Sequence, residues 1–105
     1  MVTINGKEYG LFYSVGARCK FDKWLINNQQ APYTEGIIEQ AILMNEAYNK
    51  ANGTKDALTK DIIYSLPARE LDALSEAVDA QRTADSTVTV EVADKPSKKA
   101  GSGAR

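Results

Sequence analysis

The chain has 105 residues, of which 43% are apolar and 26% charged, with a formal net charge of −1. This composition is typical of one small globular domain with a modest core. The chain has no histidine and a single cysteine, Cys19, which excludes an internal disulfide and a multi-thiolate metal site and removes the commonest general base. We therefore expect a protein that is not an enzyme and has no metal and no cofactor.

The charges are unevenly distributed. Residues 1–92 carry nine lysines and arginines against thirteen acidic residues, whereas residues 93–105 carry four basic residues against one acidic. An acidic body with a short basic tail is a poor match for a phosphate backbone, so nucleic acid is not the expected partner. The apolar runs are far shorter than the roughly 20 residues that span a bilayer, and no signal segment opens the chain. These features predict a cytoplasmic protein without membrane contact.

The first residues predict a β-hairpin. Asn5-Gly6 stands between alternating apolar and polar residues, a pattern typical of a two-residue turn with positive φ. Such a turn pairs Val2 with Tyr9 and Ile4 with Lys7. The strands then present one apolar face, which needs a helical layer beneath it. This face is expected to consist of Val2, Ile4, Tyr9 and Leu11.

Four helical segments are expected after the hairpin. Ser14 caps the first, which runs to about residue 28 and carries an aromatic stripe with Phe21 and Trp24. We expect this stripe to face the hairpin. Thr34 is the expected cap of the second helix, which is apolar around more than half its circumference and ends at Gly53 in the left-handed conformation.

The third segment is expected to start at Thr54, and the fourth, opened by Pro67, to end at about Arg82. Residues 87–92 alternate between valine and polar residues, which predicts a strand. From residue 93 the chain has no large apolar residue, so a disordered basic tail is expected. The predicted architecture is therefore an α+β domain over residues 1–92, a hairpin with or without a third strand near 87–92 packed on about four helices, followed by a flexible tail at 93–105.

Particular side chains are assigned to the core. Cys19 lies in an apolar helix without a nearby histidine, so a buried structural thiol is expected. Trp24 is expected to pack on the hairpin. The helical residues predicted to pack against the hairpin are Phe21, Trp24, Leu25, Ile38, Ile42, Leu71 and Leu74.

Two stretches of the chain resemble a known family. The run Thr3-Ile4-Asn5-Gly6-Lys7-Glu8-Tyr9, with the aromatic residues after it, and the segment Phe21-Asp22-Lys23-Trp24-Leu25 resemble the opening strand, turn, strand and helix of small tail assembly chaperones of long-tailed (siphovirus-type) bacteriophages and prophages. The resemblance covers about the first quarter of the chain. It implies a protein of the host cytoplasm that binds the tape measure protein and helps to recruit tail tube subunits.

Such a chaperone needs an exposed apolar surface for helical segments of its partner. The residues predicted to form this groove are Ile37, Ile38, Met44 and Tyr48, and the alternative is that they fill the protein's own core. Two other functions remain open. One is a small helical adaptor or structural protein of a mobile element, which would form a homo-oligomer, and the other is a weak nucleic-acid binder that uses the basic tail.

Overall fold

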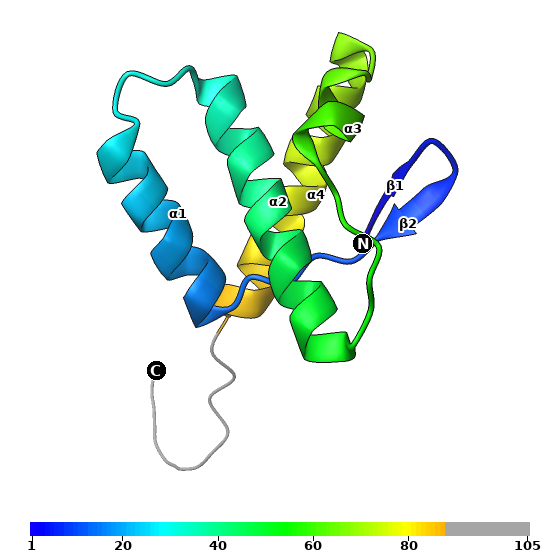
Figure 1. Ribbon diagram of the computed structural model, residues 1–105, viewed down its shortest axis with the longest axis horizontal. Coiled ribbons are helices and arrows are strands. Elements are labelled where there is room, and N and C mark those ends of the chain that lie inside the picture. Colours follow the sequence, from blue (N-terminus) through cyan, green and yellow to red (C-terminus); the bar gives the residue numbers. More distant parts are fainter. Residues whose placement is uncertain (88–105) are drawn as a thin grey trace, which may run out of the picture.

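The chain folds into one hairpin and four helices in the computed structural model, which describes residues 1–87 (Figure 1). The strands are β1 (Val2–Ile4) and β2 (Lys7–Tyr9), and the helices are α1 (Val15–Asn27), α2 (Tyr33–Asn52), α3 (Lys60–Tyr64) and α4 (Ala68–Ser86). The predicted α+β class is confirmed. The third strand expected near 87–92, apart from Thr87, and the tail expected at 93–105 lie outside the described residues.

The hairpin has the predicted register. β1 and β2 are antiparallel, with Val2 opposite Tyr9 and Ile4 opposite Lys7. The turn residues Asn5 and Gly6 have φ angles of 53° and 78°, as a two-residue turn that matches the twist of the strands requires. The turn chemistry of two residues therefore fixes which side chains share a face of the hairpin.

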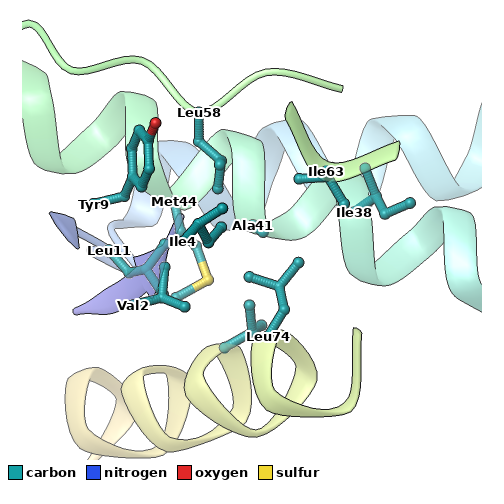
Figure 2. Close-up of a cluster of buried hydrophobic side chains, with 11 residues drawn as sticks. Val2, Ile4, Tyr9, Leu11, Ile38, Ala41, Met44, Leu58, Ile63 and Leu74 are labelled. Atoms are coloured by element: carbon teal, nitrogen blue, oxygen red, sulfur yellow. The ribbon is translucent and has the colours of Figure 1, made fainter. Parts of the chain in front are cut away.

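The core lies between the hairpin, α2 and α4. Figure 2 shows hairpin side chains gathered around Met44 of α2, which is 0% exposed, with Leu74 of α4 close by. All four residues predicted for the apolar face of the hairpin are buried there. The buried cluster consists of Val2, Ile4, Tyr9, Leu11, Ile38, Ala41, Met44, Leu58, Ile63, Leu74 and Val78.

Helix α1 lies on the other side of α2 from the hairpin (Figure 1). The prediction that its aromatic stripe faces the hairpin is wrong, as is the prediction that Trp24 packs there. Phe21 and Trp24 instead lie over Gly36 of α2, with ring atoms 3.9 Å from the place a Cβ on that glycine would take. The reason is the route of residues 10–14, where the Phe12 N–H donates to the Met44 carbonyl at 3.0 Å and the chain crosses α2.

The caps of α1 and α2 follow the sequence in part. The Ser14 hydroxyl accepts a hydrogen bond from the Ala17 N–H at 3.0 Å, and Gly53 ends α2 with a φ of 67°, as predicted. Thr34, however, does not cap α2. The helix begins before it, with Pro32 as its N-cap and without a side-chain cap, because proline already holds the backbone angle that suits a helix entry.

The two remaining helices differ from the prediction at their ends. Thr54 does not start a helix, because its hydroxyl donates to the Asn49 side-chain carbonyl at 2.6 Å and ties it to the end of α2. The short helix α3 is capped by Thr59 instead. Helix α4 continues past Arg82 to Ser86.

A buried asparagine joins three parts of the fold. Asn45 of α2 is 1% exposed; its Nδ2 donates to the Gly10 carbonyl at 2.9 Å, and its Oδ1 accepts from the Leu58 N–H at 2.8 Å. The same Oδ1 accepts a longer bond from Asn49. Asn45 therefore fastens both the exit of the hairpin and the loop before α3 to the central helix, a role that the sequence analysis did not assign.

Candidate partner-binding groove

The four residues predicted to form a groove do not form one surface. Ile38 and Met44 are 3% and 0% exposed and belong to the core, so neither is open to a partner. Ile37, Met44 and Tyr48 do share a face of α2, at seven- and eleven-residue spacing. The hairpin covers the middle of that face, and Ile37, nearer the start of α2, lines the groove between α1 and α4. Ile38 lines a different hollow, between α2, α3 and the start of α4.

Tyr48 has a structural role. Its ring lies against the backbone of buried Gly10, so closely that a Cβ added there would collide with the ring. A residue with a side chain at position 10 would force Tyr48 away from the hairpin exit. Tyr48 therefore supports the turn of the chain from β2 towards α1.

The open groove lies over the first half of α2, with walls made by α1 and α4 and a volume of about 300 Å³. The two wall helices pack mainly against α2, which leaves a channel between them. We call it the α1–α4 groove. It is defined by Phe21, Trp24 and Leu25 of α1, Ile37 and Gln40 of α2, and Val78 and Arg82 of α4, with Tyr33 at one end.

One end of the α1–α4 groove is apolar and aromatic. The rings of Phe21 and Trp24 are stacked, with centroids 5.9 Å apart and planes 8° from parallel. On the rim, Leu25 is 44% exposed and Tyr33 is 80% exposed. Aromatic and aliphatic groups that remain open to water at the edge of a concave surface are typical anchors for a partner.

The other end of the groove is polar. Gln40 is only 6% exposed, and its Oε1 accepts from an Arg82 guanidinium nitrogen at 3.4 Å. The same nitrogen lies 3.4 Å from the Asp79 carboxylate. A neighbouring hollow shares Phe21, Leu25, Gln40 and Arg82 with the groove and extends it to Arg18 and Asp22 of α1.

Gln40 and Arg82 are not among the site residues predicted from the sequence. Gln40 could have been recognised as a polar residue within the apolar surface of the second helix. Arg82 gave no local signal, because it is separated from Gln40 by 42 positions and the two meet only through the packing of α4 on α2. The groove is therefore a product of tertiary structure.

Cys19 is exposed and forms no disulfide, so the predicted buried thiol is wrong. It lies on the outward side of α1, away from buried Ala17, because the side of the helix with Phe21 and Trp24 faces α2. The outward side also carries Val15, 80% exposed, and Ile26, 66% exposed.

Two exposed polar contacts join neighbouring segments at the surface. The Tyr64 hydroxyl donates to the Glu35 carboxylate at 2.6 Å, and this hydrogen bond raises the pKa of Tyr64 above its ordinary value. The Lys7 ammonium lies 3.0 Å from the Asp56 carboxylate, and the hydrogen bond between them raises the pKa of Lys7. These contacts link α3 to α2 and the hairpin to the loop after α2.

Within residues 1–87 no helix is both long and apolar enough to cross a bilayer. In the same part of the chain, no three cysteine or acidic side chains stand close enough together to hold a metal ion. Comparisons of the chain with protein-family models, curated proteins and solved structures found no match.

Proposed function

We propose that the chain is a tail assembly chaperone of a long-tailed bacteriophage or prophage. It acts in the host cytoplasm without catalysis, binds helical segments of the tape measure protein and helps to recruit tail tube subunits. The observation that carries the proposal is the α1–α4 groove, which leaves an aromatic end and apolar rim residues open on a small helical protein. The resemblance of residues 3–9 and 21–25 to the family supports it.

The arrangement of the helices suits a helical partner. Because α1 and α4 pack mainly on α2, a helix laid between them would be the fourth member of a bundle, with its apolar side chains pointing at α2. Anchors in such a groove recur every three or four residues along the partner. A long helical protein offers many segments of this kind, so one groove can bind it at several places.

The size of the groove fits a reversible complex. About 300 Å³ is at the small end of the range for ligand pockets, and it has room for a few partner side chains. A contact limited to a few anchors gives modest affinity. The tape measure protein must be released when tube subunits assemble around it, and modest affinity permits that release.

Co-expression with the tape measure protein of the same genome tests the proposal. The parent chain is expected to keep that protein soluble, and Leu25→Asp or Tyr33→Asp is expected to abolish the effect, because each puts a charge at the apolar end of the groove. Val15→Asp is the control, since Val15 is as exposed as Tyr33 but lies outside the groove. All variants are checked by circular dichroism. Full solubilisation by the folded Leu25→Asp and Tyr33→Asp chains would contradict the proposal.

A second candidate is the helical adaptor that forms a homo-oligomer. The observation in its favour is the pair Val15 and Ile26, which leave apolar groups in water on the outward side of α1. If this side joins two copies, the parent chain sediments as a dimer and the double variant Val15→Asp/Ile26→Asp as a monomer. A parent that sediments as a monomer at all concentrations removes this candidate. The third function, nucleic-acid binding through residues 93–105, depends on residues outside the described range.

A further inference from the structure

Gln40 has an amide donor that the described part of the chain does not use. Its side chain is more than nine-tenths buried and lies at the floor of the α1–α4 groove. With Oε1 turned to Arg82, the two N–H groups of Nε2 have no acceptor within residues 1–87. Buried amides are nearly always hydrogen-bonded, so an acceptor from outside this part of the chain is expected at this place.

Arg82, next to Gln40, also has few hydrogen bonds, and those it has are long. Its two contacts in the described residues, to Gln40 and Asp79, come from one nitrogen and are both 3.4 Å long. Charge-assisted hydrogen bonds of arginine are usually about 2.7–2.9 Å and often bidentate. The rest of the guanidinium fork has no hydrogen bond to residues 1–87, and its side chain is 44% exposed.

We propose that the polar end of the α1–α4 groove binds a carboxylate of the partner helix, with Arg82 and the Gln40 amide as donors. This inference rests on the proposed function and specifies which segments the groove selects. A carboxylate fits because its two oxygens can accept from the amide and the guanidinium at once, and because it can bind the planar guanidinium of an arginine through two parallel hydrogen bonds. A neutral amide oxygen would serve Gln40 but would leave Arg82 with only its exposed 3.4 Å contact to the Asp79 carboxylate.

The length of the groove predicts how far apart the carboxylate and the apolar anchors lie along the partner helix. Arg18 marks the polar end of α1 and Trp24 the apolar end, six residues further along, which is about 9 Å of helix. The partner helix is therefore expected to place its aspartate or glutamate about one turn from a first apolar anchor and about two turns from a second. Segments with this spacing should bind in preference to those with apolar anchors alone.

The acidic residues at the polar end of the groove do not prevent a partner carboxylate from binding there. Arg18 and Arg82 line the two neighbouring hollows together with Asp22 and Asp79. The Asp79 carboxylate lies 3.4 Å from Arg82, and the Asp79 side chain is 60% exposed. A partner carboxylate that reaches Arg82 with short, bidentate geometry gains more than this exposed contact loses, because exposed pairs contribute little.

The test uses stapled helical peptides of about five turns. Each carries a stripe of leucines at three- and four-residue spacing and a glutamate one turn before or one turn after the stripe. The matched peptides have glutamine in place of the glutamate. They are titrated into the isotope-labelled full chain, and the Gln40 side-chain amide and the Trp24 indole are followed by NMR.

The glutamate peptide in one of the two orientations is expected to bind the parent about tenfold more tightly than its glutamine match, with a shift of the Gln40 amide signal. The ratio is expected to fall to about one in Arg82→Met and to persist in Arg69→Met, the same change at an exposed arginine of α4 outside the groove. Equal binding of the two peptides to the parent, no binding of either, or a ratio that survives Arg82→Met would overturn the inference.

Co-expression with the tape measure protein separates this inference from the proposed function. Solubilisation that is lost in Leu25→Asp but unchanged in Arg82→Met overturns the carboxylate site alone. Glutamate-dependent peptide binding by a chain that does not solubilise the tape measure protein overturns the proposed function alone. The two outcomes come from different experiments, so failure of the carboxylate site can be distinguished from failure of the proposed function.

Discussion

Replacing Asn45 by leucine is expected to lower the free energy of unfolding by about 1–5 kcal/mol. The change leaves two buried groups without partners, the Gly10 carbonyl and the Leu58 N–H, and each such group costs about 1–3 kcal/mol. The apolar side chain of leucine recovers about 1 kcal/mol through its own burial. The loss is a large share of the roughly 5–15 kcal/mol that stabilises a typical domain.

Asn45→Asp separates the two hydrogen bonds through pH. The carboxylate keeps an acceptor for the Leu58 N–H but points a second oxygen at the Gly10 carbonyl, and the hydrogen-bond partners of Asn45 are all neutral. Burial then raises the pKa of the new carboxyl in the folded state above the unfolded value of about 3.9. The protonated form can donate to Gly10. Stability close to that of the parent is therefore present below about pH 4 and is lost as pH rises through the folded pKa.

Urea unfolding, followed by Trp24 fluorescence and circular dichroism, measures these effects at about pH 3 and about pH 7, always relative to the parent at the same pH. Asn27→Asp at the exposed C-terminal end of α1 is the control, and its loss between the two pH values should stay within the roughly 0.3–1 kcal/mol that an acidic group costs at a helix C-terminus. If Asn45→Leu stays within about 0.5 kcal/mol of the parent, or if the loss in Asn45→Asp does not grow with pH, the hydrogen bonds of Asn45 do not stabilise the fold as described.

Three further changes test other contacts. Gly10→Ala is expected to lower the melting temperature because of the collision with the Tyr48 ring, and part of the loss should return in Gly10→Ala/Tyr48→Ala; an additive double-mutant cycle would contradict the contact. Trp24→Ala is expected to cost about 1–2 kcal/mol, less than the 3–5 typical of a core aromatic, because Trp24 is only partly buried; urea unfolding measures this, and a larger loss would place it in the core. Lys7 and Tyr64 have raised pKa values in the folded state, so their contribution to stability is present at neutral pH and is lost above about pH 10; alkaline unfolding curves of Lys7→Met and Tyr64→Phe should fall less steeply than that of the parent.

The parts of the fold that local chemistry decides could be predicted from sequence. The φ preference of Asn5-Gly6 fixes the register of the hairpin, and with it the four buried residues of its apolar face. Ser14 and Gly53 cap helix ends by interacting with backbone groups only a few residues away in the sequence. In each case the interacting residues are close together in the sequence, so the pattern can be recognised from one sequence alone.

The side of α2 on which α1 packs could not be predicted in this way. The aromatic stripe of α1 shows that one face is apolar, and periodicity does not say which layer covers it. The route is set by distant contacts, the Phe12 N–H to Met44 and the Gly10 carbonyl to Asn45. Periodicity also does not say which side of an apolar helix is covered, so the sequence predicts a buried Cys19, which is exposed, and a partner surface at Ile38 and Met44, which are buried.

Gly36 gives a last test, because it connects the stability of the domain to the depth of the α1–α4 groove. It lies in the first turns of α2, where alanine is usually more favourable by about 0.5–1 kcal/mol. A Cβ there would meet Phe21 and Trp24 at 3.9 Å, an ordinary contact, so Gly36→Ala should raise the melting temperature.

The added methyl group also stands on the floor of the groove beneath the apolar rim, and it should weaken the proposed binding of the tape measure protein. Thermal unfolding and co-purification of the same variant measure the two effects. A variant that is more stable and binds less would mean that the glycine is kept for the groove at the expense of the helix. A variant that is more stable and binds equally would show that the partner does not reach the floor, which would move the binding surface to the rim around Leu25 and Tyr33.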